Sequence, residues 1–198
     1  KGNGVAGHSI THNLGVAPEM IWVKNRGTTN KSWNAYLGPL GLSGGAPAYA
    51  VLNETDAAAY STTRFYTTPT ATEFSVGSNS RVNTSGDDYI AYLFASLPGI
   101  SKVGSYTGDD TNGRVIDCGF TTGARFIIIK RTNLIGNWNL WDSVRGIVTG
   151  NDPYIELDNT AAEVTTTDYV DPHASGFIVN FHAKMNKSGN TYIFYAIA

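Results

Sequence analysis

The sequence has little of the chemistry on which many enzymes and nucleic-acid-binding proteins depend. A single cysteine, Cys118, stands among 198 residues, so no internal disulfide and no cysteine-based metal site can form. Charged residues make up only 15% of the chain, the net charge is -2, and Lys and Arg form no cluster. A phosphate backbone is bound by such clusters, so we expect no nucleic acid partner. Apolar runs stay far below the roughly 20 residues that cross a bilayer, and we expect no membrane insertion.

The lone thiol is expected to be structural. Cys118 is followed by apolar Phe120 in a strand-like run, and its segment contains no base that could activate a thiolate. A buried, unreactive side chain is therefore the prediction. The sequence contains no phosphate loop or nucleophile elbow, and we expect no cofactor.

What the sequence does contain is an internal repeat. Residues 83–95 return as residues 186–198, at an offset of 103. Further matches follow in the same order at offsets of 103 to 106, and they pair 19–25 with 125–131, 32–36 with 137–141, 49–53 with 154–158, and 74–76 with 177–179. The offset changes within polar stretches, where loops tolerate small deletions. The pattern predicts a tandem duplication, with the first copy in residues 1–100 and the second in residues 101–198.

The two copies are expected to differ at their starts. When Gly2 is aligned with Gly108, the strand-like segment 102–106 of the second copy has no counterpart before Lys1. We therefore expect the first copy to lack its opening strand. The chain is then expected to be an excised or processed piece of a longer polypeptide, or a sequence whose beginning was not recorded.

Periodicity favours strands throughout. Residues 20–23 and 126–129 are continuous apolar runs that are too short for helices and typical of central strands. Residues 89–94 and 192–197 are aromatic and apolar on both faces, and each is expected to close its copy as a core strand. Gly86 and Gly189 stand in polar corners just before these segments, where positive φ costs glycine little, which predicts tight hairpins.

The fold class predicted from these patterns is all-β. Only residues 55–60 and 160–163 look helical, and neither segment exceeds a turn or two. Short strands separated by regular turns indicate a tandem duplicated antiparallel β-sandwich of jelly-roll or concanavalin-like type, with about seven or eight strands per copy.

Aromatic residues are the best candidates for ligand binding. Trp33 and Trp138 share one position in the two copies and are expected in the core, whereas Tyr36 and Trp141 point to the opposite face of the same strands. If solvent covers that face, Tyr36 and Trp141 can bind the flat side of a sugar ring. If a second sheet or a neighbouring subunit covers it, they pack there. Two aromatic residues beside nearby loops complete the candidate ligand-binding set: Tyr49 and Tyr154.

Catalytic residues and metal ligands are not expected. A glycosidase needs two carboxylates that flank one cleft, and the repeat preserves no matched pair. The carboxylates considered lie in or beside turns: Glu54, Asp56, Glu73, Asp158 and Glu163. The histidines lack metal-ligand spacing. Three oxygen-rich groups, residues 108–113, 87–88 and 168–171, lack the full ligand pattern of a calcium loop and are more typical of turns.

Several motifs together resemble a known kind of domain. They are residues 11–26 (THNLGVAPEMIWVKNR), the pair Ser32-Trp33, and residues 85–95 (SGDDYIAYLFA). This series is similar to an uncharacterised duplicated β-domain of virion structural proteins of tailed bacteriophages, frequent in marine and cyanobacterial phages and often beside laminin-G-like or concanavalin-like modules. The likeness covers nearly the whole chain, but residues 121–125 of the second copy depart from residues 15–19 of the first.

The resemblance implies a non-enzymatic module of a tail fibre, another appendage or a capsid decoration, at the surface of the virion. Its implied partners are other virion proteins and further copies of the chain, a trimer being implied by the resemblance alone, with a cell-surface glycan as a ligand for host attachment. Loops at 26–32, 38–48, 60–72, 131–137 and 143–153 are expected to meet the outside. The alternatives are a secreted carbohydrate-binding module of a glycan-active enzyme, and a glycosidase domain.

Overall fold

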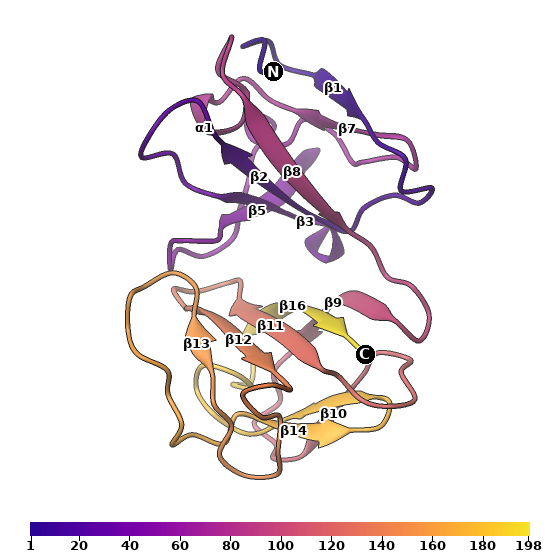
Figure 1. Ribbon diagram of the computed structural model, residues 1–198, viewed down its shortest axis with the longest axis vertical. Helices are drawn as coiled ribbons and strands as arrows, with labels where there is room; N and C mark the ends of the chain where they lie inside the picture. Colours follow the sequence, from indigo (N-terminus) through magenta and orange to yellow (C-terminus); the bar gives the residue numbers. More distant parts are fainter. The chain divides into compact units, whose positions relative to one another are not determined.

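The computed structural model describes residues 1–198 and shows an all-β protein (Figure 1). The chain folds as two compact units, Lys1–Ala95 and Ser96–Ala198, which divide slightly ahead of the boundary expected from the repeat. Every ladder between named strands is antiparallel. Helical segments are short, and none has the length and apolar character needed to span a membrane.

Unit 1 contains two sheets. The larger has the strand order β4-β5-β3-β2-β8, and a short strand, β6, pairs with β5; the smaller is β1-β7. The bounds are β1 His8–Thr11, β2 Met20–Asn25, β3 Asn34–Leu37, β4 Leu42–Ser43, β5 Ala46–Val51, β6 Ala59–Tyr60, β7 Glu73–Val76 and β8 Tyr89–Phe94. Side chains of both sheets form one core with Phe65 and Val82, which lie outside the sheets; the sheet residues are Ile21, Val23, Tyr36, Phe74 and Val76.

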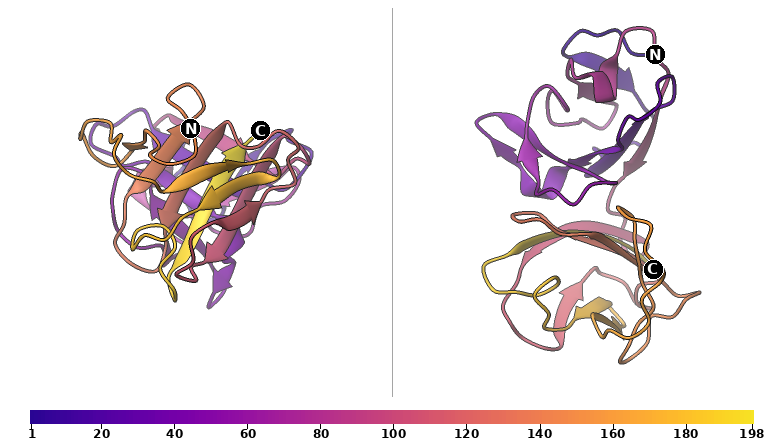
Figure 2. Two further views of the ribbon diagram at one scale, coloured as in Figure 1. Left: turned by 90° about the horizontal axis from the view of Figure 1, so that it is seen from below. Right: turned by 90° about the vertical axis from the view of Figure 1, so that its left-hand side faces the viewer.

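Unit 2 also contains a larger and a smaller sheet, and its smaller sheet has three strands where that of unit 1 has two. The larger sheet has the order β13-β12-β11-β16-β9 and the smaller β10-β15-β14. The bounds are β9 Ser101–Thr107, β10 Arg114–Asp117, β11 Phe126–Arg131, β12 Trp138–Asp142, β13 Ile155–Glu156, β14 Val170–His173, β15 Gly176–Val179 and β16 Thr191–Ile197. In the right-hand view of Figure 2 the smaller sheet of this unit lies below its larger sheet.

The continuous apolar runs form the centres of the large sheets. β2 lies between β3 and β8, and β11 lies between β12 and β16. In β2, Ile21 and Val23 enter the core of unit 1, and in β11, Ile127 and Ile129 enter that of unit 2. Because side chains alternate along a strand, the residues between them supply a second apolar face, which explains why the runs are unbroken.

The two closing strands differ. β16 is an inner strand, paired with β11 on one side and β9 on the other, and its residues from Tyr192 to Ala196 are buried. β8 is the last strand of its sheet, and none of its residues is fully buried. The expectation of a core strand is therefore correct for β16 and wrong for β8, because no strand covers the outer edge of β8.

Local predictions were right for the glycines and wrong for the helices. Gly86 and Gly189 have φ of 84° and 78°, as their polar corners predict. The corner at Gly86 does not join two strands of a hairpin, because the segment before it is the helical turn α1, Ser80–Asn83. Residues 55–58 are not helical, because so short a run forms too few hydrogen bonds to offset the free-energy cost of helix nucleation. Ala59–Tyr60 pair with β5 instead.

A fully buried asparagine organises the corresponding corner of each unit. The Nδ2 of Asn83 donates to the backbone carbonyls of Val5 and Gly77, both at 2.9 Å. The Nδ2 of Asn186 donates to the carbonyl of Thr111 at 2.7 Å and to Oδ1 of Asp109 at 2.9 Å. Each asparagine thus ties the first loop of its unit to the segment that precedes the closing strand.

Candidate functional site

The four aromatic residues predicted to bind a ligand lie inside the units. Tyr36 and Tyr49 are neighbours across β3 and β5, with Tyr36 only 4% exposed and Tyr49 half-buried against the same core. Trp141 and Tyr154 are 0% and 3% exposed, and their ring centroids are 5.5 Å apart. The sequence left open whether solvent or other protein covers the strand face that carries Tyr36 and Trp141. In the structure, the second sheet of each unit covers it. The aromatic rings therefore pack, and burial raises the pKa of Tyr36.

A cleft of about 290 Å³ opens beside β5 and the turn that follows it. Polar and small side chains line this cleft, which we call the β5 cleft: Tyr49, Glu54, Asp56, Ala59, Arg64 and Arg81. Glu54 and Asp56 were among the carboxylates considered from sequence, and the structure brings them to one site. The two arginines were not predicted there, because they lie 10 and 27 residues after Glu54 and only the fold brings them to it.

Arg64 gives the β5 cleft a fixed wall. Its Nη1 donates to Oδ1 of Asn34 and to Oδ1 of Asn79, each at 2.9 Å. Its Cζ lies 5.2 Å from the centre of the Tyr49 ring, within the range of a cation–π contact. Asn79 also caps α1, because its Oδ1 accepts a bond from the backbone N–H of Arg81 at 2.9 Å. The guanidinium and ring are therefore held in place before any ligand arrives.

Glu54 and Arg81 supply the opposite charges of the β5 cleft. Oε1 of Glu54 accepts hydrogen bonds from Oγ of Ser32 at 2.7 Å and from Nη1 of Arg81 at 3.2 Å. The two charged side chains are about one third exposed, so water screens their pairing and it contributes little to stability. They remain able to exchange hydrogen bonds with a small polar molecule.

The other carboxylates considered from sequence are engaged in local structure at separate places. Asp158 accepts bonds from the backbone N–H of Trp138 at 2.6 Å and from Nδ2 of Asn137 at 2.8 Å. Glu163 pairs with Nε of Arg145 at 2.9 Å, and Glu73 accepts a bond from Oγ of Ser9 at 2.7 Å.

The oxygen-rich loop at residues 108–113 is also internally satisfied. Oδ1 of Asp109 accepts bonds from Oγ1 and the backbone N–H of Thr111, at 2.7 and 3.0 Å, and these bonds hold the pKa of Asp109 below its usual value. Asp110 pairs with Nζ of Lys187 at 2.8 Å, which likewise lowers the pKa of Asp110. The carboxylates stabilise the loop against the corner at Asn186.

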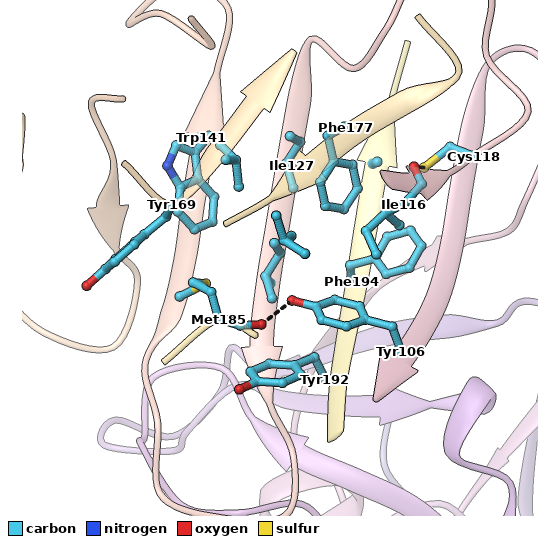
Figure 3. Packing of buried hydrophobic residues seen from close by; sticks show 14 of the residues in the cluster. Tyr106, Ile116, Cys118, Ile127, Trp141, Tyr169, Phe177, Met185, Tyr192 and Phe194 are labelled. Atoms are coloured by element: carbon cyan, nitrogen blue, oxygen red, sulfur yellow. Dashed lines mark hydrogen bonds between the residues drawn. The ribbon is translucent and has the colours of Figure 1, made fainter. Parts of the chain in front are cut away.

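Cys118 is buried within unit 2 (Figure 3). Burial raises the pKa of its thiol to about 12, and its Sγ lies 3.7 Å from the carbonyl oxygen of Ile116. A thiol with that pKa is almost wholly protonated at neutral pH and is a poor nucleophile.

Asp152 is a buried carboxyl that sequence reasoning missed. It is 0% exposed, its Oδ1 accepts a bond from the backbone N–H of Val148 at 2.8 Å, and its Oδ2 has no partner. Burial raises the pKa of Asp152 to about 7, with smaller contributions from the negative charges of Asp171 and Asp168. No local pattern marks this residue, because its burial depends on the fold of residues 143–153 over β14.

Replacing Asp152 with asparagine is expected to stabilise unit 2 at pH 8 more than at pH 4. The folded-state pKa of Asp152 is raised from 3.8 to about 7. The contribution of this carboxyl to the free energy of unfolding is therefore most favourable below about pH 4 and is lost as the pH rises to 7. The loss amounts to about 1.4 kcal/mol per unit of pKa shift. Urea unfolding across this pH range measures it, and Asp56→Asn controls for the loss of one exposed charge. Equal effects of Asp152→Asn at both pH values would contradict the assignment.

The fold defines a class of protein: an all-β chain with two antiparallel units, each of a larger and a smaller sheet. The chain belongs to the family described as a domain of unknown function (DUF7483), whose model matches residues 1–198. No curated protein matches the chain, and no solved structure matches it. The family description carries no activity, so function is inferred from the residues and their arrangement.

Proposed function

We propose that this chain is a non-enzymatic structural module of a tailed-bacteriophage virion, located in a tail fibre, another appendage or a capsid decoration. The observation that carries this proposal is the position, in the structure, of the sequence motifs that resemble the phage domain. They include β2, the turn at Gly86 and β8, which are parts of the frame of unit 1. On this proposal, what the chain would share with phage structural proteins is a scaffold.

The proposal includes a tandem duplication of a β-sandwich unit, of jelly-roll or concanavalin-like type. Three correspondences support it. The strand order β5-β3-β2-β8 of unit 1 corresponds to the order β13-β12-β11-β16 of unit 2. Asn83 and Asn186 are both fully buried. Gly2 and Gly108 both approach a backbone so closely that an added Cβ would lie 2.1 Å from the carbonyl oxygen of Thr84 and 2.2 Å from that of Lys187.

Contacts with virion partners are assigned to the loops between these strands. Five large aliphatic side chains in the segments expected to meet the outside are exposed: Leu42, Leu134, Ile135, Val144 and Val148. Val144 is 96% exposed, the highest value among the large hydrophobic residues. The proposal places the contacts with other proteins at these side chains. We propose that the partners are other virion proteins and further copies of this chain, with a trimer favoured.

The experiment that tests the proposal is assembly. Wild-type chain is expected to self-associate in analytical ultracentrifugation and to incorporate into phage particles. The double variant Ile135→Asp and Val144→Asp is expected to lose both properties while its circular dichroism stays unchanged. Val5→Asp, at a residue that is 64% exposed outside these loops, is the matched control. A monomer at all concentrations that also stays off particles would refute the structural role.

A carbohydrate-binding module is the second candidate, and the β5 cleft is the observation that favours it. A preformed cleft with carboxylate, guanidinium and phenol groups can exchange hydrogen bonds with sugar hydroxyls. A titration with bacterial surface polysaccharides tests this function. Saturable binding by the monomer that is lost in Arg81→Gln, and retained in Arg145→Gln of unit 2, would establish this function in place of the first.

A further inference from the structure

Arg64 in the β5 cleft is half-buried and has no acidic partner. Its Nη1 donates to the neutral side-chain oxygens of Asn34 and Asn79, and its guanidinium lies over the ring of Tyr49. None of the ion pairs of the chain includes Arg64. The fold thus holds a positive charge in a fixed position without a counterion. Partial burial of an unpaired charge costs free energy, which a bound anion would offset.

One edge of the Arg64 guanidinium is free. The two asparagines take up the hydrogens of Nη1, which leaves the N–H groups of Nε and Nη2. Neither Nε nor Nη2 makes a hydrogen bond, and neither atom is buried. Together they form the parallel fork through which arginine binds a carboxylate or a phosphate with two hydrogen bonds. The free edge of Arg64 is therefore a preformed pair of donors for one anion.

Unit 2 has an aromatic ring where unit 1 has this guanidinium. Gly77 donates its backbone N–H to the carbonyl of Arg64 at 3.0 Å. Asn180, the counterpart of Gly77 at an offset of 103, donates to the carbonyl of Tyr169, also at 3.0 Å. The matching hydrogen bonds make Tyr169 the counterpart of Arg64.

The rings of unit 2 pack together at the corresponding position. The ring centroid of Tyr169 lies 5.2 Å from that of Tyr154 and 4.6 Å from that of His182. In the repeat, Tyr154 corresponds to Tyr49 and His182 to Asn79. Unit 2 thus has a packed aromatic cluster where unit 1 has an arginine and an asparagine, so the free donors belong to unit 1 alone.

The charges around the β5 cleft favour a ligand with a single negative charge. Two arginines, Arg64 and Arg81, and two acids, Glu54 and Asp56, line the cleft, so their formal charges cancel. Glu54 is paired with Arg81 at 3.2 Å and Asp56 is exposed to water, so both repel a bound carboxylate only weakly. A phosphate dianion would meet twice that repulsion. The oxygens of the two acids can also accept hydrogen bonds from hydroxyl groups.

We propose that the β5 cleft binds an acidic sugar, a pyranose ring that bears one carboxylate. The carboxylate accepts hydrogen bonds from Nε and Nη2 of Arg64, and ring hydroxyls donate to Glu54 and Asp56. The cleft volume of about 290 Å³ suits one such ring, and the rest of a polysaccharide extends into solvent. This inference rests on the second candidate function, carbohydrate binding at the β5 cleft, and names the class of sugar that the cleft selects.

The test compares sugars that differ in one group. The methyl glycosides of glucuronic and galacturonic acid carry a carboxylate where those of glucose and galactose carry a hydroxymethyl group. Each is titrated into the ¹⁵N-labelled full chain, with inorganic phosphate as a fifth probe. An acidic glycoside is expected to bind about tenfold more tightly than its neutral partner, because it alone makes hydrogen bonds between charged groups. It should also shift the Nε–H signal of Arg64 and bind more tightly than phosphate.

Arg64→Gln is expected to remove the preference for the acidic glycosides. Unit 1 should still fold, because in unit 2 Asn139, the counterpart of Asn34, is buried without a partner for its Oδ1. Arg114→Gln is the matched control and should leave the preference unchanged. The guanidinium of Arg114 also lies over a tyrosine ring, 5.4 Å from its centre, but it is paired with Asp109 at 3.2 Å.

The outcomes separate this inference from the function on which it rests. Equal affinity for acidic and neutral glycosides would overturn the inference and leave carbohydrate binding in place, whereas no binding of any sugar would overturn both. Acidic preference that survives Arg64→Gln would place the carboxylate on another group. Tighter binding of phosphate would make the cleft a general anion site, against the proposal. The comparison of sugars on the wild-type chain decides the matter even if Arg64→Gln does not fold.

Discussion

Replacing Trp141 with alanine is expected to lower the free energy of unfolding of unit 2 by about 3–5 kcal/mol, the usual cost of deleting a buried aromatic side chain. Trp141 is 0% exposed, its ring lies 5.5 Å from that of Tyr154, and it meets Tyr169 edge-on at 6.4 Å. Urea unfolding measures the loss, and hydrogen exchange of β11 amides assigns it to unit 2.

Trp141→Phe is the matched variant. The indole N–H of Trp141 is buried without a partner, and an unpaired buried donor costs about 1–3 kcal/mol. Phenylalanine removes that donor and keeps most of the ring, so its effect should be much smaller than that of alanine. If Trp141→Ala kept wild-type stability and lost glycan binding instead, the residue would be a ligand contact and the packing role would be wrong.

Asn186→Ala is expected to destabilise unit 2 by about 2–4 kcal/mol. Removal of this side chain leaves the buried groups to which it was hydrogen-bonded without a partner. Those groups include the carbonyl of Thr111 and the N–H of Asp109, which donates to Oδ1 of Asn186 at 3.2 Å. Asn83→Ala should act alike in unit 1, where Asn3 donates its N–H to Oδ1 of Asn83 at 2.8 Å.

Two measurements separate this prediction from a general effect of losing an asparagine. Hydrogen exchange should show that Asn186→Ala opens unit 2 and leaves β2 of unit 1 protected, with the reverse for Asn83→Ala. Asn133→Ala is the control. The Nδ2 of Asn133 donates to the carbonyl of Gly189 and to Oδ1 of Asn190, both at 3.3 Å, and these hydrogen bonds are exposed or half-exposed. An effect of Asn133→Ala as large as that of Asn186→Ala would contradict the prediction.

Much of the frame can be read from the sequence, because apolar runs and turn glycines act locally. The runs at 20–23 and 126–129 lie in the central strands β2 and β11, and Gly86 and Gly189 have positive φ. The helical expectation at 55–60 was wrong because pairing with β5 outweighs the weak propensity of a short alanine run.

Site geometry could not be predicted to the same extent. Alternation shows that Tyr36 and Trp141 share a face of their strands, but it does not say that the smaller sheet covers that face. Arg64 and Arg81 join Glu54 through tertiary structure alone.

The burial of Cys118 gives the molecule an internal reporter of its own opening. A maleimide or disulfide reagent cannot reach this thiol while unit 2 is closed, and the raised pKa leaves little thiolate to react. Since the sequence has no other cysteine, every labelled molecule has exposed this one position. The rate of thiol labelling therefore measures how often unit 2 opens, without any probe added to its surface. The same measurement applies to single-residue variants of the chain and to the chain inside a crowded particle.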